Sequence, residues 1–187
     1  MPEIGKFYLA LILFILLIGL IVGLIEKYPT NGDEPTYQPD KWIESTYQKY
    51  NNCYAYALDN LKVRDRKPQP AEQQSPVYTC QHLKKWIDKD LVDKTGQKYS
   101  LLDGDNQKLC PRGYHKIYLV HNNYDYHFYR LDSDGLWSHK PGSGEVTRLD
   151  GNGDLMTDPS LASHNYNNFE YDHQCGFLCV PTIDERW

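Results

Sequence analysis

Cys53 and two of the seven histidines in this 187-residue chain have the residue types and settings that nucleophilic chemistry needs. In the stretch NNCYAYALDN, Cys53 follows Asn52, a residue type that often caps helices, which predicts a helix over about 53–62. Partial positive charge at a helix N-terminus stabilises a thiolate, the reactive form of cysteine. The alternative interpretation of Cys53 is a small apolar side chain at the edge of a core.

A thiol nucleophile also needs a base and a residue that orients the base. His127 lies in YDYHFYR and His139 in LWSHK, two segments that follow one another along the chain. A bulge at Gly135 in the connecting turn would place Tyr129 opposite His139. Because side chains alternate along a strand, His127 would share their face and become a diagonal neighbour of His139. This spacing predicts a catalytic triad of Cys53, His127 and His139.

Hydrophobic periodicity predicts the elements that position these residues. A second helix is expected after Thr79, because apolar residues follow at helical spacing: Leu83, Trp86, Ile87 and Leu91. The second half of the chain changes to alternation, which predicts strands at 114–121, 125–132, 136–140 and 176–181. Helices followed by an antiparallel meander predict an α+β domain.

The apolar run FYLALILFILLIGLIVGLI, residues 7–25, has 19 residues without a charged side chain. At about 1.5 Å per residue, such a helix approaches the ~30 Å hydrocarbon thickness of a bilayer. A secretory signal is the alternative, although its apolar region is usually shorter. Three prolines in the next segment favour an extended spacer. We therefore expect a membrane anchor over 1–27, a spacer over 28–41 and a folded domain over 42–187 in a single-pass membrane protein.

Charge and cysteine content narrow the expected partners and ligands. The net charge is −5 and no run of Lys or Arg occurs, so nucleic acid is not expected as a partner. No C-x-x-C pair occurs, and neither a metal nor a cofactor is expected. Without Cys53, four cysteines allow three disulfide pairings, and in an oxidising compartment we expect a Cys80–Cys110 bridge. Free thiols are the alternative.

Two groups of motifs carry a family resemblance: NCYAYA at 52–57, and HFYR with GLWSHKPG within 127–142. They are similar to motifs of a poorly characterised group in bacteria and large DNA viruses, related to the NlpC-type branch of papain-like cysteine hydrolases. The similarity extends to LDGNGDLMTDP at 149–159. It implies a papain-like (NlpC-type) α+β domain in which the helix that starts at Cys53 packs on an antiparallel sheet. It also implies a cysteine peptidase or amidase, with Cys53 as nucleophile, His127 as general base and His139 as the orienting residue.

Two functional hypotheses follow. The first is a membrane-anchored cysteine hydrolase that acts on an amide or acyl bond. The second is a structural tether without catalysis, such as a minor capsid protein that links the internal membrane of a large DNA virus to its shell. The expected location is a membrane or, for the tether, the membrane and capsid of a virion. The expected partners are a lipid bilayer and a protein assembly, either a capsid or a homo-oligomer.

Overall fold

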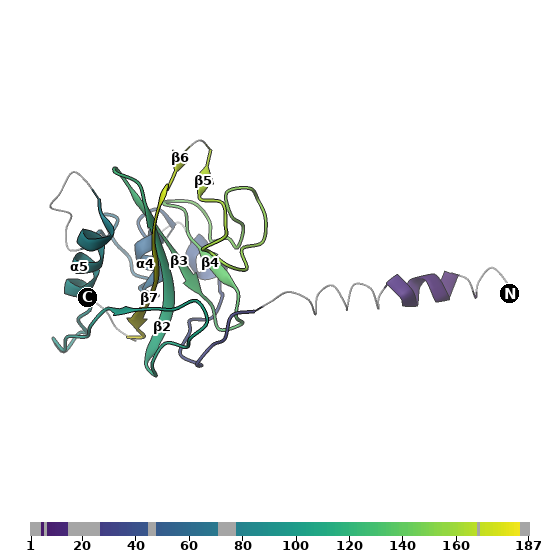
Figure 1. Cartoon of the computed structure of the whole chain (residues 1–187), viewed down its shortest axis with the longest axis horizontal. Helices are drawn as coiled ribbons and strands as arrows, with labels where there is room; N and C mark the ends of the chain where they lie inside the picture. Colours follow the sequence, from purple (N-terminus) through teal and green to yellow (C-terminus); the bar gives the residue numbers. More distant parts are fainter. Residues whose placement is uncertain are drawn as a thin grey trace.

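A computed structural model describes residues 5, 7–14, 27–44, 48–70, 78–167 and 169–183. Within them, five antiparallel strands form a sheet in the order β1-β7-β2-β3-β4, and two short strands, β5 and β6, form a separate hairpin (Figure 1). The strands are β1 (Leu102–Asp103), β2 (Tyr114–His121), β3 (Tyr126–Leu131), β4 (Trp137–His139), β5 (Asn165–Tyr166), β6 (Phe169–Glu170) and β7 (His173–Pro181). Besides the helical residues 7–14, the helices are α2 (Asp40–Ile43), α4 (Cys53–Ala57) and α5 (Cys80–Asp90).

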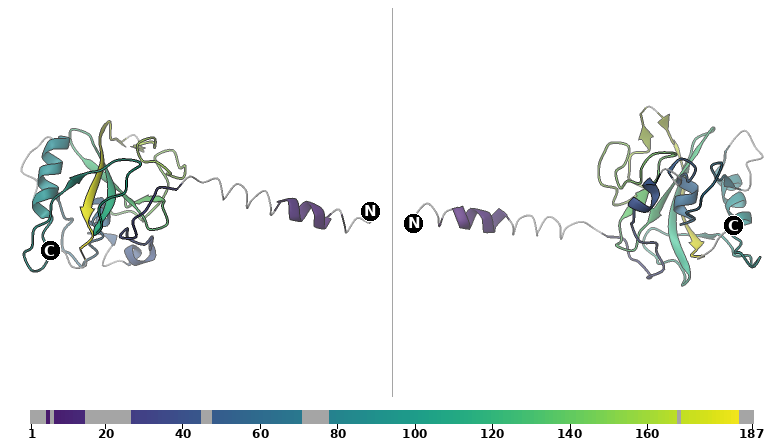
Figure 2. Two further views of the ribbon diagram at one scale, coloured as in Figure 1. Left: turned by 60° about the horizontal axis from the view of Figure 1, so that its bottom comes forward. Right: turned by 180° about the vertical axis from the view of Figure 1, so that it is seen from behind.

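The sheet is buried on both faces, and alternation along β2 shows how its residues divide between them. Ile117 and Leu119 belong to the core that α4 and α5 cover, whereas Tyr118 and Val120 belong to the core on the other face. Seen from behind in Figure 2, α4 lies in front of the strands. The second face is covered by the loop between β4 and β5 and by Tyr28.

The two expected helices differ in how closely they match their predicted lengths. The four apolar residues with helical spacing, three in α5 and Leu91 directly after it, are all buried. The Thr79 side chain accepts a hydrogen bond from the main-chain N–H of His82 at 3.2 Å. The second predicted helix is thus confirmed. Helix α4 ends at Ala57 instead of about residue 62, because Asp59 adopts a left-handed conformation with φ of 51°.

The turn between β3 and β4 has the predicted register. Tyr129 pairs with His139, and the main-chain N–H of Gly135 donates to the carbonyl oxygen of Asp132 at 2.9 Å. Gly135 has φ of 80°, and a Cβ at this position would lie 2.7 Å from the carbonyl oxygen of Tyr28. Glycine is therefore required both by the backbone conformation and by the close approach of another segment.

The segment 28–41, expected to be a spacer, contacts the sheet repeatedly. The Asn31 side chain donates hydrogen bonds to three carbonyl oxygens in and before β2, those of Cys110, Pro111 and Tyr114. The Tyr28 ring packs edge-on against Trp137, with ring centroids 5.3 Å apart. These contacts attach the segment to the strands.

The predicted fold class is wrong. A papain-like (NlpC-type) α+β domain preceded by one transmembrane helix was expected, but the described chain is mostly antiparallel sheet with short helices, and α5 has only 11 residues. No helix in the described ranges is both long and apolar enough to cross a membrane. Residues 7–14 of the predicted span are helical, and 15–25 lie outside the described residues. Part of the error lies in the first helix, because helical spacing at 53–62 suggested more helix than the turn at Asp59 permits.

Two disulfides attach other parts of the chain to β7. Cys80 is bonded to Cys175, and Cys110 to Cys179, so the predicted Cys80–Cys110 bridge is wrong. Cys53 is the free cysteine of the described chain.

A one-residue bulge in β7 explains the first pairing. Consecutive residues of β2 pair with Gly176 and Gln174, which leaves Cys175 as the extra residue. The bulge places Cys175 on the face of Leu178, where α5 packs. In a regular strand, Cys175 would point to the opposite face and could not reach Cys80.

Removal of the Cys110–Cys179 bridge should destabilise the fold strongly. The bridge joins residues 69 positions apart, and loss of such a link typically costs about 2–5 kcal/mol. We expect the Cys110→Ser/Cys179→Ser variant to show this loss in urea unfolding, relative to the unchanged chain. Cys53→Ala is the control, because it removes a cysteine without opening a bridge. Equal stability of the double variant and the unchanged chain would contradict the expectation.

Candidate functional site

Cys53 is the first residue of α4, as predicted. The side-chain oxygen of Asn52 caps the helix by accepting a hydrogen bond from the main-chain N–H of Ala55 at 3.2 Å. The amide nitrogen of Asn52 donates to the carbonyl oxygen of Pro68 at 2.9 Å, which ties the cap to the loop after the helix. Cys53 is buried, with 5% of its surface exposed.

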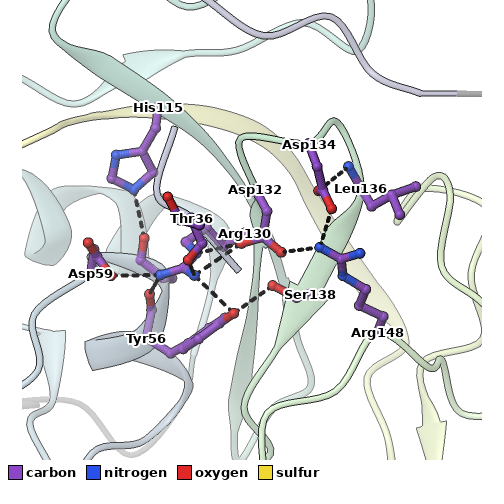
Figure 3. Close-up of polar contacts among 11 residues, drawn as sticks. Thr36, Tyr56, Asp59, His115, Arg130, Asp132, Asp134, Leu136, Ser138 and Arg148 are labelled. Carbon is purple, nitrogen blue, oxygen red and sulfur yellow. Dashed lines mark hydrogen bonds and ion pairs between the residues drawn. The ribbon is translucent and has the colours of Figure 1, made fainter. Parts of the chain in front are cut away.

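Arg130 of β3 holds α4 against the sheet (Figure 3). Its Nη1 donates to the carbonyl oxygen of Tyr56 at 3.1 Å and to Asp59 at 2.9 Å. Its Nη2 donates to the Tyr56 hydroxyl at 3.0 Å, and its guanidinium lies 3.9 Å from the centre of the Tyr56 ring. At the end of the same helix, the His115 ring contacts the carbonyl oxygen of Ala57 at 2.8 Å. The position of Cys53 is therefore set partly by contacts about one turn further along α4 and just beyond its end.

The same guanidinium connects to the β3–β4 hairpin. Arg130 donates through Nε and Nη2 to Oδ1 of Asp132, at 3.1 and 3.0 Å. Arg148 lies 3.5 Å from the other oxygen of Asp132 and pairs with Asp134 at 2.7 Å. Ser138 of β4 completes the cluster through a 2.7 Å hydrogen bond with the Tyr56 hydroxyl. Arg130 and Asp132 are fully buried, so each compensates the other's loss of hydration.

The Cys53 thiol lies against the main chain of β3. Its hydrogen-bond partner is the carbonyl oxygen of Tyr126, 3.9 Å from Sγ, and the main-chain N–H of Phe128 is a further polar neighbour. These groups belong to the residues on either side of His127. The thiol is thus next to the strand segment that carries the predicted base, but its hydrogen bond goes to the main chain.

Burial determines the protonation of this thiol. Loss of hydration raises the pKa of Cys53 to about 12, and the negative charge of Asp125 acts in the same direction. Main-chain N–H groups, including that of Phe128, favour the thiolate but are outweighed. At neutral pH Cys53 is therefore a protonated thiol, although its place at a helix start favours a thiolate.

The two predicted partners, His127 and His139, do meet. Nε2 of His127 and Nδ1 of His139 are 2.8 Å apart, and Nε2 of His139 is 2.8 Å from the carbonyl oxygen of Leu149. A carbonyl oxygen only accepts, so His139 carries its proton on Nε2, and its Nδ1 accepts from Nε2–H of His127. This leaves Nδ1 of His127 as the nitrogen with a lone pair, the tautomer that a general base needs.

Both histidines are neutral in the folded protein. Burial lowers the pKa of His127 well below its ordinary value, and the neighbouring His139 lowers it further. Burial also lowers the pKa of His139 to about 4, against a smaller opposing effect of the Leu149 carbonyl. The pair is thus an uncharged hydrogen-bonded unit at neutral pH.

Aromatic residues that the sequence did not single out surround His127. Its ring contacts Tyr129, Tyr166 and Tyr171, with centroids 4.9, 5.9 and 5.5 Å apart. The Tyr129 hydroxyl bonds with Nδ1 of His164 at 2.8 Å and with the Tyr166 hydroxyl at 3.1 Å. The alternation in NYNNFEY could have suggested a small hairpin here, but nothing in the sequence placed it over His127.

The cluster is closed and uncharged. Cys53, His127 and His139 are 5%, 3% and 0% exposed. The geometry contains a correctly protonated imidazole pair beside a thiol that is not ionised. The assignment of these three residues as a catalytic triad stays a prediction.

These features define a disulfide-bonded antiparallel-sheet protein with a buried polar cluster. The chain is 32% identical over 139 residues to insoluble matrix shell protein 1 of Ruditapes philippinarum, and the match covers 71% of this chain and 84% of that protein. The chain therefore belongs to the family of this shell matrix protein. No family model and no solved structure matches the chain, so the resemblance to NlpC-type hydrolases stays untested.

This relationship corrects several predictions. A single-pass membrane protein was expected, either hydrolase-like or a viral minor capsid protein, with a location in a membrane or virion. The relative is a shell matrix protein, and no helix in the described ranges could span a membrane, so these predictions of class and location are wrong. Of the two functional hypotheses, the relative fits the structural one. The predicted partners stay predictions.

We expect the Cys53 thiol to be unreactive in the folded protein. With 5% exposure and a pKa of about 12, it should not react with iodoacetamide near neutral pH while the chain is folded. In concentrated guanidinium chloride without a reductant, the same thiol should be alkylated completely. Peptide mass spectrometry measures both, and rapid labelling of Cys53 in the folded chain would show instead that it is an accessible, activated nucleophile.

The stability of the fold should fall as the pH falls from about 6.5 to about 4. His139 titrates near 6.5 when unfolded and near 4 when folded, so in this window the unfolded state binds the extra proton. His127 acts in the same direction, and each contributes about 1.4 kcal/mol per pH unit. Burial raises the pKa of Asp125 and Asp132, which opposes the trend.

The test is urea unfolding across this pH range, with a His127→Gln/His139→Gln variant beside the unchanged chain. The variant should show a flatter dependence of unfolding free energy on pH. Parallel curves for the two proteins would assign the pH dependence to other groups.

Proposed function

We propose that this chain is a structural component of an insoluble extracellular protein matrix. The observation that carries the proposal is its membership in the family of insoluble matrix shell protein 1, over most of the length of that protein. Such a role requires assembly with other proteins or with copies of the same chain, which is the kind of partner that the sequence suggested.

The disulfides support an extracellular role. Four of the five cysteines are paired, and both bridges attach the last strand of the sheet to distant parts of the chain. Disulfides form and persist in oxidising environments such as the extracellular space. A matrix protein must also stay folded outside the cell, where cross-links of this kind limit unfolding.

The state of the polar cluster also supports a structural role. Cys53 is protonated and buried, and His127 and His139 are neutral and bonded to each other. Groups in these states can join α4, β3 and β4 through satisfied hydrogen bonds. Buried polar networks of this kind specify one arrangement of a core when every member has a partner.

The test is sequential extraction of the tissue that produces the protein, followed with an antibody against the chain. We expect most of the endogenous chain to stay in the pellet after salt extraction and to dissolve only in a denaturant. The control is tagged recombinant chain added before homogenisation, which should appear in the salt extract because it has not been assembled. Extraction of the endogenous chain by salt, together with the tagged chain, would overturn the proposal.

A further inference from the structure

A second cluster of reactive side chains lies at the Cys80–Cys175 bridge. The two sulfur atoms and a ring nitrogen of His121 all lie within 4.8 Å of one another. Three different elements supply them: Cys80 is the first residue of α5, Cys175 is the bulge residue of β7, and His121 is the last residue of β2. Sulfur and imidazole nitrogen are the donor atoms that zinc prefers in proteins.

The hydrogen bond made by His121 sets a tautomer that suits a metal ligand. Its ring is buried, and Nδ1 lies 2.9 Å from the carbonyl oxygen of Asn122. Because that oxygen only accepts, Nδ1 carries the proton and Nε2 keeps its lone pair. Metal-binding histidines are commonly held in this way, with one ring nitrogen donating to a carbonyl oxygen and the other facing the metal.

We propose that reduction of the Cys80–Cys175 bridge creates a zinc site formed by the two thiolates and Nε2 of His121. Zinc bonds of roughly 2.3 Å to sulfur and 2.0 Å to nitrogen place tetrahedral ligand atoms about 3.5–4 Å apart. The present cluster is within 4.8 Å, so the site needs only local side-chain rotation. A water molecule fills the fourth position. This inference is independent of the proposed matrix role.

The zinc site forms only after a dithiol reductant has reduced the Cys80–Cys175 disulfide. The reductant supplies two electrons and two protons, the S–S bond breaks, and the reductant becomes a disulfide. Zinc then displaces one proton from each thiol. Cys80 lies in the first turn of an 11-residue helix, where the helix dipole favours its thiolate.

The second bridge provides an internal comparison. Among the described residues, Cys110 and Cys179 do not belong to a group of three potential metal ligands. Both are 4% exposed, whereas Cys80 and Cys175 are only partly buried. A small amount of dithiol should therefore open the Cys80–Cys175 bridge first.

The experiment measures zinc binding by the full chain after mild dithiol treatment and removal of the reductant, by competition with a chromophoric chelator. Thiol mapping by mass spectrometry verifies which bridge is open. We expect the reduced chain to bind one zinc ion and the oxidised chain to bind none. Cobalt should give the thiolate charge-transfer bands of a tetrahedral site. Equal zinc binding by the oxidised and reduced chains would overturn the proposal, as would no binding by the reduced chain.

Matched histidine variants test the third ligand. His121→Ala should weaken zinc binding at least tenfold. His82→Ala is the control, since His82 is exposed and follows Cys80 by two residues, yet is not in the cluster, and it should bind zinc like the unchanged chain. Unchanged affinity in His121→Ala, or equal losses in both variants, would refute the site.

A second measurement covers the case in which reduction unfolds the chain. Near-ultraviolet circular dichroism follows the aromatic packing as zinc is added to the reduced chain. Recovery of the folded signal with one equivalent of zinc, together with protection of Cys80 and Cys175 from alkylation, supports the site, because metal binding then drives folding. A reduced chain that stays unfolded and freely alkylated in zinc contradicts it.

Discussion

The buried guanidinium of Arg130 is the constraint on which much of this structure depends. A charge without exposure to water costs several kcal/mol unless other groups compensate for the lost hydration. Arg130 obtains that compensation from Tyr56 and Asp59 near α4, from Asp132 in the hairpin turn, and from the carbonyl oxygen of Thr36 at 3.4 Å. These segments are far apart in sequence. They must pack together because the N–H groups of the single Arg130 side chain donate to all of them.

This constraint explains why the polar cluster has its present form. With α4 held on one face of the sheet, Cys53 reaches the main chain of β3 from that side. His127 and His139 lie with Tyr129 on the other face, under the aromatic cover of the β5–β6 region. Cys53, His127 and His139 are all buried, and the resulting loss of hydration keeps the three side chains uncharged. A cysteine and two histidines whose types and spacing suit catalysis can thus be buried as part of the protein interior.

Local rules predicted the parts of the structure that depend on nearby residues. The Asn52 cap, the apolar stripe of α5 and the Gly135 bulge that pairs Tyr129 with His139 all follow from short-range geometry. The fold class and the disulfides did not follow, because they depend on distant contacts. The pairing of Cys175 requires a bulge next to Gly176, which has φ of 91°, but a glycine within a strand does not by itself specify where a bulge falls. The burial of Cys53 depends on segments that pack around it from elsewhere in the chain.

The attachment of both bridges to β7 has a consequence for the order of events during synthesis. Cys80 and Cys110 leave the ribosome well before Cys175 and Cys179, so for a time they can pair only with each other or with Cys53. Neither native bridge can close before the cysteines of β7 have been synthesised, and in the folded chain both bridges hold β7 between β1 and β2. The two native disulfides therefore form only after β7 has been synthesised. An oxidant that acts before then would form non-native disulfides among the earlier cysteines.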